Sequence, residues 1–163
     1  MRSASRIEPL IPEHEQLMSP CRTVFLSATL TLLTTCAVAA GADFSGTWSM
    51  DLRTTEQKAA NAECGMASFV LKQTGARITG SHTFATAGCG RLNEGGEGTV
   101  KGRVVGTVAH LVVTSGRNGA VVKGVATLRN DALYWETKEE VSAGVQGDSP
   151  LILDKGLLTK ASN

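Results

Sequence analysis

Two histidines in the second half of the chain are the side chains best suited to acid–base chemistry, because imidazole titrates near neutral pH. His82 alternates with apolar residues on the predicted inner face of a strand, and His110 lies among valines on a predicted outer face. Neither has a nucleophile or a carboxylate at a spacing that would build a catalytic triad. We therefore expect a hydrogen-bonded core histidine at position 82, a half-exposed histidine at position 110, and no enzymatic activity.

Carboxylate clusters could bind a metal ion or hydrolyse a glycosidic bond, but their spacing in this chain is not diagnostic. The run 93–97 combines Asn and Glu with two glycines, yet it lacks the ligand spacing of an EF-hand calcium loop. We expect a solvent-exposed strand end for the three glutamates Glu136, Glu139 and Glu140. A glycosidase site built from paired carboxylates is the alternative. We expect no metal and no cofactor.

The four cysteines divide into two pairs by their position along the chain. Cys21 and Cys36 lie at an apolar N-terminal run and would be removed with it on cleavage. Cys64 and Cys89 then remain, and an even number of cysteines in an exported protein predicts a disulfide. Closing a loop of about 25 residues would stabilise the fold by roughly 3.5 kcal/mol in the chain-entropy model.

The first forty residues predict an export signal rather than part of the fold. The run 23–40 is uncharged, follows a basic residue and ends in small residues, with an A-x-A cleavage pattern at 37–39. We assign the signal peptide to residues 18–40, with Met18 as the true start and residues 1–17 as a mis-started leader. The protein is therefore expected in the periplasm or outside the cell.

A retained membrane anchor is the alternative to cleavage, although about 17 apolar or hydroxylic residues are short for a span of roughly 20. Lipidation at Cys36 is disfavoured because Thr35 stands where a lipobox has Gly, Ala or Ser. We therefore expect membrane contact only through the transient signal peptide.

The basic residues do not follow a pattern typical of nucleic-acid binding. The chain has 16 Lys and Arg against 15 Asp and Glu, a net charge of +1, whereas phosphate recognition needs a strongly basic surface. Lys101, Arg103, Lys123 and Arg129 project from the predicted outer face without interleaved aromatic residues. We predict a solvated face there and no nucleic-acid partner.

From residue 43 onward the hydrophobic pattern has period two, with turn residues between the runs. It predicts eight strands, over 44–52, 66–73, 77–85, 98–105, 107–114, 120–129, 132–139 and 151–160. A short helix is predicted over 54–62, capped by Thr54 or Thr55. This order favours an all-β fold, an eight-stranded antiparallel up-and-down barrel with the helix in its first connection. A two-sheet sandwich is the alternative, and residues 41–163 would form a single domain in either case.

Glycine usage supports the barrel. The chain has 18 Gly against 4 Pro, and several glycines fall at inward positions of the predicted strands, including Gly46, Gly80, Gly102 and Gly124. Inward glycines suit a small barrel, whose backbone must coil sharply or approach a neighbour closely.

Loop lengths alternate along the predicted barrel. The second, fourth and sixth connections are tight, whereas the first, third, fifth and seventh are mostly long. Because alternate connections of a meander lie at the same end, the long loops would gather at one end, here called the long-loop end. Cys64 and Cys89 both fall there, which fits their pairing. We expect the functional site at this end, because loops carry function disproportionately.

Gly46-Thr47-Trp48 opens the first predicted strand and resembles the Gly-x-Trp signature of the calycins, the lipocalin and avidin-like barrels. In those families a basic residue of the last strand often packs over the tryptophan, and Lys155 or Lys160 could match it. The resemblance implies a small apolar ligand in or near the lumen. The candidate ligand contacts are Trp48, Phe69, His82, Phe84 and Trp135. The same side chains would also serve simply to fill an eight-stranded barrel.

A second resemblance covers residues 115–138. The run 115–120, followed by 134–138, is similar to the paired motifs of bacterial periplasmic inhibitors of c-type lysozyme, which are also eight-stranded barrels. This chain departs from them by inserting Arg-Asn before Gly-Ala, by lacking the aromatic residue after Ala, and by having Glu139 in place of Gly. The resemblance implies an envelope protein as partner. The candidate partner contacts are Arg91, Ser115, Arg117, Asn118 and Lys138.

The volume of the lumen distinguishes these two functions. An open pocket of roughly a few hundred Å³ would favour a small-molecule ligand. A packed lumen with protruding, rigid loops would favour a protein partner.

Overall fold

The computed structural model describes residues 41–162, and every structural statement below concerns this part of the chain. The predicted leader, the signal peptide and Cys36 lie outside the described residues. Within 41–162, no helix is long and apolar enough to cross a membrane.

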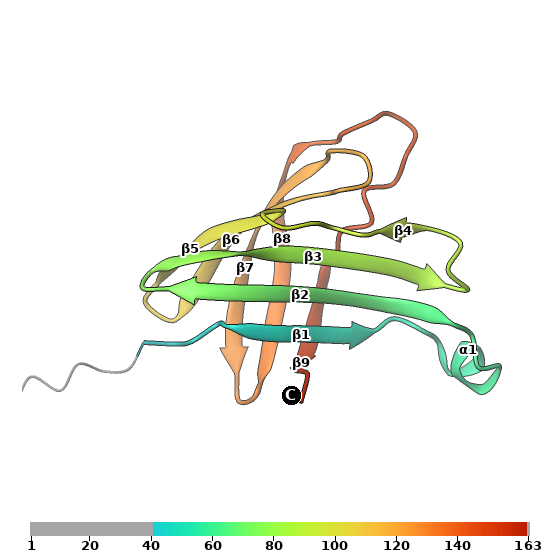
Figure 1. The fold of residues 1–163 in the computed structure, drawn as a ribbon, viewed down its shortest axis with the longest axis horizontal. Helices are drawn as coiled ribbons and strands as arrows, with labels where there is room; N and C mark the ends of the chain where they lie inside the picture. Colours follow the sequence, from blue (N-terminus) through green and yellow to red (C-terminus); the bar gives the residue numbers. More distant parts are fainter. Residues whose placement is uncertain (1–40, 163) are drawn as a thin grey trace, which may run out of the picture. The chain divides into compact units, whose positions relative to one another are not determined.

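Eight antiparallel strands close into a barrel, with a very short ninth strand at one edge (Figure 1). The strands are β1 (Gly46–Asp51), β2 (Cys64–Thr74), β3 (Arg77–Ala87), β4 (Leu92–Asn93), β5 (Val100–Val105), β6 (Val108–Thr114), β7 (Val121–Arg129), β8 (Ala132–Ser142) and β9 (Lys155–Lys160). Strand β3 pairs with β2, β4 and β5, and β1 pairs with both β2 and β9, which closes the ring. The predicted up-and-down barrel is confirmed, and the sandwich is excluded.

Helix α1 (Thr55–Ala59) lies in the connection between β1 and β2, as the sequence predicts. Thr54 caps it. The Thr54 hydroxyl accepts a hydrogen bond from the Gln57 backbone N–H, and the Gln57 side chain accepts one from the Thr54 N–H. This reciprocal arrangement satisfies two donors that a helix end otherwise leaves unpaired.

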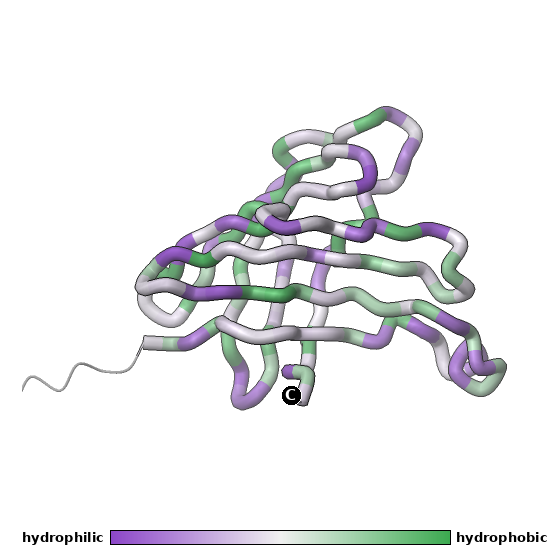
Figure 2. The backbone as a smooth tube through the Cα atoms, in the orientation of Figure 1, coloured by the Kyte–Doolittle hydropathy of each residue, from purple (hydrophilic) through white to green (hydrophobic). Residues whose placement is uncertain are grey.

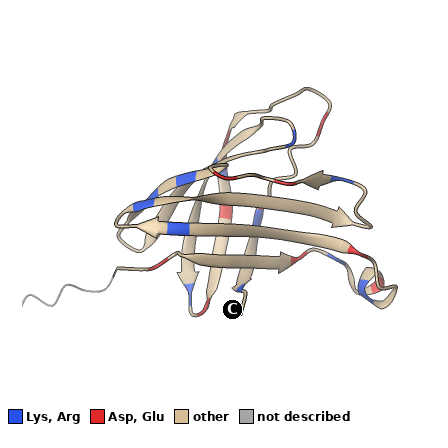
Figure 3. Ribbon diagram, in the orientation of Figure 1, with Lys and Arg blue, Asp and Glu red and all other residues tan. Residues whose placement is uncertain are grey.

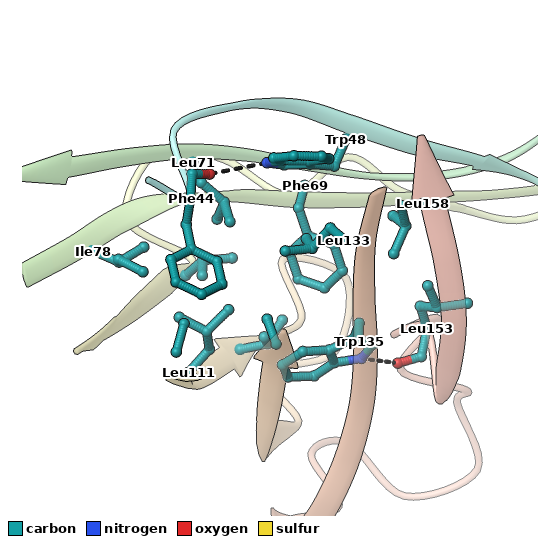
Figure 4. Packing of buried hydrophobic residues seen from close by; sticks show 14 of the residues in the cluster. Phe44, Trp48, Phe69, Leu71, Ile78, Leu111, Leu133, Trp135, Leu153 and Leu158 are labelled. Carbon is teal, nitrogen blue, oxygen red and sulfur yellow. Dashed lines mark hydrogen bonds between the residues drawn. The ribbon is translucent and has the colours of Figure 1, made fainter. Parts of the chain in front are cut away.

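Alternate residues of the strands point inward and fill the barrel. Hydrophobic and hydrophilic residues alternate along the strands (Figure 2). Figure 3 shows the charged residues in loops and on strands, and none of those in the described part of the chain is buried. The large side chains with no accessible surface include Phe44, Phe69, Ile78, Leu133, Trp135 and Leu158. No water-sized space borders such a side chain, so these residues pack against one another across the lumen, as protein interiors generally do (Figure 4).

Two inward glycines are required by close approach. A Cβ at Gly124 would overlap the indole ring of Trp135 and the carbonyl of Glu136, and one at Gly80 would overlap the backbone of Val70. At both positions a neighbouring strand or ring occupies the space of a side chain. The inward glycines predicted from the sequence therefore have a packing role.

The structure differs from the sequence prediction at two strands. Strand β4 is a two-residue strand that pairs with β3 inside the predicted long third loop. Strand β9 begins at Lys155 instead of residue 151, since Leu151 has a positive φ of 47° and the backbone of Leu153 bonds to the side chains of His82 and Trp135. Beyond that point β9 runs through Gly156 without a break.

The loops gather as the meander predicts. The tight connections 75–76, 106–107 and 130–131 lie at one end of the barrel, here called the tight-turn end. At the other end a disulfide joins Cys64, at the start of β2, to Cys89 in the loop after β3, with a Cα–Cα distance of 5.3 Å. The predicted pairing is confirmed.

Candidate functional site

Three of the predicted ligand contacts stack in the middle of the lumen. The rings of Phe69 and His82 stack with centroids 4.4 Å apart and planes 24° apart, and the Trp135 ring is tilted by 50° against Phe69 at 5.2 Å. All three residues have no accessible surface. Their faces are therefore covered by other side chains, and no ligand-sized space borders them.

His82 is a hydrogen-bonded core histidine, as the sequence predicts. Its Nε2 accepts a hydrogen bond from the Leu153 N–H at 3.2 Å, so Nδ1 carries the proton and donates to the Ser68 carbonyl at 2.8 Å. Burial lowers the pKa of His82 to about 4, against the opposing effect of the Ser68 carbonyl. At neutral pH the ring is uncharged and both of its nitrogens are occupied.

The other two predicted ligand contacts lie nearer the rim of the lumen. Trp48 is buried, donates from its indole to the Phe44 carbonyl at 2.9 Å, and has the Lys160 ammonium 5.2 Å from its ring centroid. A basic residue of the last strand thus approaches this tryptophan, as the calycin resemblance implies. Phe84 is partly buried, and its backbone pairs with Asn93 of β4.

Residues 150–154, here called the plug segment, close the long-loop end of the lumen. Leu151 and Leu153 are 6% and 5% exposed. The Leu153 carbonyl accepts hydrogen bonds from the Trp135 indole at 2.7 Å, visible in Figure 4, and from the Thr137 hydroxyl at 3.3 Å. Together with the Leu153 N–H bond to His82, these contacts fix the segment across the mouth of the barrel.

Asn93 lies in the run 93–97 for which the sequence favours a solvated turn over a calcium loop, and the structure buries it at the centre of a network instead. It is 1% exposed, and its amide nitrogen donates to the Leu151 carbonyl at 3.1 Å and, more weakly, to the Pro150 carbonyl at 3.4 Å. Its side-chain oxygen accepts from the N–H groups of Gly95 and Gly116, each at 3.1 Å. The side chain of Asn93 thus joins three loops by hydrogen bonds.

Two of the predicted partner contacts are buried members of the same network. Ser115 is 2% exposed and donates to the Pro150 carbonyl at 2.7 Å, and Asn118 is 6% exposed and donates to the Asp148 carbonyl at 2.7 Å. The Asn118 carbonyl in turn accepts from the Val145 N–H at 2.9 Å. These side chains hold loops together and are not presented to a partner.

Arg117 connects the network to the surface. Its guanidinium pairs with the Asp148 carboxylate at 2.9 Å and donates to the Leu92 carbonyl at 3.2 Å, yet 30% of its side chain stays exposed. Arg91, next to Leu92, is exposed. Lys138 lies elsewhere, on the outer face of β8, where it pairs with Glu136 at 2.8 Å. The structure therefore brings Arg91 and Arg117 to one loop cluster and leaves Lys138 outside it.

Exposed apolar side chains lie on the same cluster. Leu92 is 40% exposed and Val145 is 63% exposed. The guanidinium of Arg117 bonds to the backbone of Leu92, and Asn118 bonds to the backbone of Val145, so both apolar residues are held by the network. We call Arg91, Leu92, Arg117 and Val145 the loop platform.

Metal binding has little support from the geometry. Among the residues that the structure describes, no three His, Cys, Asp or Glu side chains lie close enough together to hold a metal ion.

No family model, curated protein or solved structure matches this chain. The chain shares a closed antiparallel barrel with the calycins and the lysozyme inhibitors. Membership of either family stays a prediction.

Proposed function

We propose that this protein is an exported, non-enzymatic binding module that recognises a partner protein through its loop platform. The observation that carries the proposal is the filled lumen, in which Phe69, His82 and Trp135 have no accessible surface. The Cys64–Cys89 disulfide supports the exported location, because disulfides persist in oxidising compartments.

The filled lumen argues against a small apolar ligand held inside the barrel. A ligand there would have to displace core side chains and the plug segment. Moving that segment would break the bonds of Leu153 to His82 and Trp135, and buried polar groups left unpaired cost about 1–3 kcal/mol each.

The loop platform has the features of a protein-binding surface. Arginine is enriched at protein interfaces and among their hot spots, and the partly exposed Arg117 bonds to the backbone of the exposed Leu92. The loops are already ordered by buried hydrogen bonds of Asn93, Ser115 and Asn118. Ordered loops lose little conformational entropy on binding, which favours affinity.

The resemblance to the periplasmic inhibitors makes a hydrolase, c-type lysozyme first, the partner to test. Immobilised protein is exposed to that enzyme and, separately, to the envelope proteins of the source cell. The Arg117→Ala variant should bind the captured partner about 30-fold more weakly, the effect of losing a hot-spot residue worth about 2 kcal/mol.

Asp148→Asn is the matched control, because it removes the ion pair but keeps the arginine side chain. We expect it to weaken binding much less than Arg117→Ala. Undiminished capture by Arg117→Ala would contradict the proposal. Equal losses in both variants would also contradict it, since they would indicate that Arg117 only orders the loop.

A further inference from the structure

Four basic residues gather on the outer face of β2, β3 and β5, near the tight-turn end. Arg77 and Arg103 are direct partners across β3 and β5, and Lys101 is the partner of Thr79, which is in turn the partner of Lys72. All four basic side chains are exposed. Figure 3 shows blue segments on β2 and on the neighbouring β5 near the tight turns. We call Lys72, Arg77, Lys101 and Arg103 the basic patch.

This arrangement of charges opposes folding. Like charges directly opposite on neighbouring strands are destabilising, and Arg77 faces Arg103 in this way. The ion pairs in the described part of the chain involve other cations, among them Lys58, Arg117 and Lys123, and none includes a member of the basic patch. In the described part of the chain the four cations therefore gather without an ion pair, and the carboxylates of Glu94 and Glu97 line a hollow with Lys72 but not with Arg77, Lys101 or Arg103.

An uncharged tip adjoins the basic patch. The turn after β2 and the turn after β5 lie side by side, because the Val104 N–H donates to the Ala76 carbonyl at 2.8 Å. The two turns, Gly75-Ala76 and Gly106-Thr107, carry only small, uncharged residues. Val105, the last residue of β5, is 64% exposed. A hollow of about 650 Å³ lies over Arg77, Lys101 and Arg103.

We propose that the tight-turn end docks on an anionic phospholipid surface. The four cations lie in the plane of the lipid phosphates, and Val105 enters the interfacial region beyond them. Cations around a projecting apolar residue are the combination by which peripheral proteins bind such surfaces. An anionic surface also supplies the counter-ions that the Arg77–Arg103 pair lacks.

This contact goes beyond the sequence-based expectation that the membrane is met only through a signal peptide. It is also independent of the proposed function, since the meander places the tight turns and the loop platform at opposite ends of the barrel. A molecule docked by its tight turns would present the loop platform away from the lipid.

Flotation with vesicles tests the proposal. The protein used is residues 41–163, because every strand and core residue described lies between positions 44 and 160 and the barrel closes within that range. Far-ultraviolet circular dichroism confirms folding of each variant. We expect binding to phosphatidylcholine vesicles containing about one-third phosphatidylglycerol, and at least tenfold weaker binding to pure phosphatidylcholine.

The double variant Lys101→Gln/Arg103→Gln should bind the anionic vesicles about 25-fold more weakly, at about fivefold for each cation near the surface. Lys58→Gln/Arg91→Gln is matched in charge but alters the long-loop end, and it should bind like the wild type. Equal losses in the two double variants would overturn the proposal, as would equal binding to neutral and anionic vesicles.

Val105→Trp distinguishes a lipid surface from a soluble polyanion. The new indole should shift its emission to shorter wavelength on anionic vesicles, because it leaves water, and it should not shift with heparin. Trp48 and Trp135 are buried and provide a constant background. Binding to heparin as tight as to the vesicles, with no emission shift on lipid, would replace the lipid surface by a polyanion site and overturn the proposal.

Discussion

His82 links three separate parts of the chain through one imidazole ring. The ring stacks on Phe69 of β2, donates to the Ser68 carbonyl and accepts from the Leu153 N–H in the plug segment. Protonating Nε2 would remove the acceptor for Leu153 and place a charge in the core. The neutral ring is therefore part of what keeps the lumen closed.

The stability of the barrel should fall between about pH 6.5 and about pH 4. The native state holds the pKa of His82 at about 4, against a usual value of 6.5, so in this window the unfolded chain binds the extra proton. His82 then contributes roughly 3 kcal/mol of stability above about pH 6.5 that is lost by about pH 4. Urea unfolding at the two pH values measures the difference.

His82→Gln is the control for this pH dependence, since it keeps a donor and an acceptor but does not titrate in that range. The lowered pKa values of Asp43, Glu56 and Glu136 also cost stability in acid, and the variant retains them. Its stability should therefore fall less than that of the wild type. The same fall in both proteins would show that His82 is not the group responsible.

Residue roles could be predicted from the sequence only in part. The alternation around Trp48 and His82 was enough to place them in a core, because inward positions of a strand follow from period two. Ser115 and Asn118 looked like exposed loop residues, and the structure buries both. Their burial depends on Pro150 and Asp148, which lie 35 and 30 residues further along, and no local pattern encodes these contacts.

At the scale of elements, the disulfide is the covalent link of the long-loop end. It joins the start of β2 to the loop that leads from β3 into β4. That loop continues to Asn93, whose amide orders the plug segment. The cross-link therefore limits the freedom of the chain on one side of the loop platform.

Replacing both cysteines, as Cys64→Ser/Cys89→Ser, should lower the free energy of unfolding by about 3.5 kcal/mol, because the unfolded chain gains loop entropy. The barrel itself should still form, since the backbone pairs of β2 and β3, including Cys64 with Ala87, do not depend on the sulfur atoms. Urea unfolding of the oxidised wild type, the reduced wild type and the variant measures the effect. Equal midpoints for all three would contradict this account.

Long strands were predictable, and the shortest strand was not. Strands β2, β3 and β8 each span 11 residues, which gives a clear period-two pattern. Strand β4 has two residues, too few to show any period. The plug segment buries Leu151 and Leu153 whereas β9 buries Leu158, so the buried positions change from odd to even numbers between the two. The positive φ of Leu151 is also not predictable from a leucine in the sequence.

At the scale of the molecule, the two ends of the barrel have different chemistry. The long-loop end carries a hydrogen-bonded network with Arg117, Leu92 and Val145 at its surface. The tight-turn end carries the basic patch and the projecting Val105. The packed lumen between them supports both surfaces as a rigid body, which is why we assign binding to the ends.

The central claim is that the lumen is filled, and a crystal pressurised with xenon tests it most directly. Xenon enters dry apolar cavities in proteins, so it reports free space whatever the natural ligand is. The account predicts no xenon site among Phe69, His82 and Trp135. A well-occupied xenon site at the centre of the barrel would contradict it and would restore the lumen as the ligand-binding site.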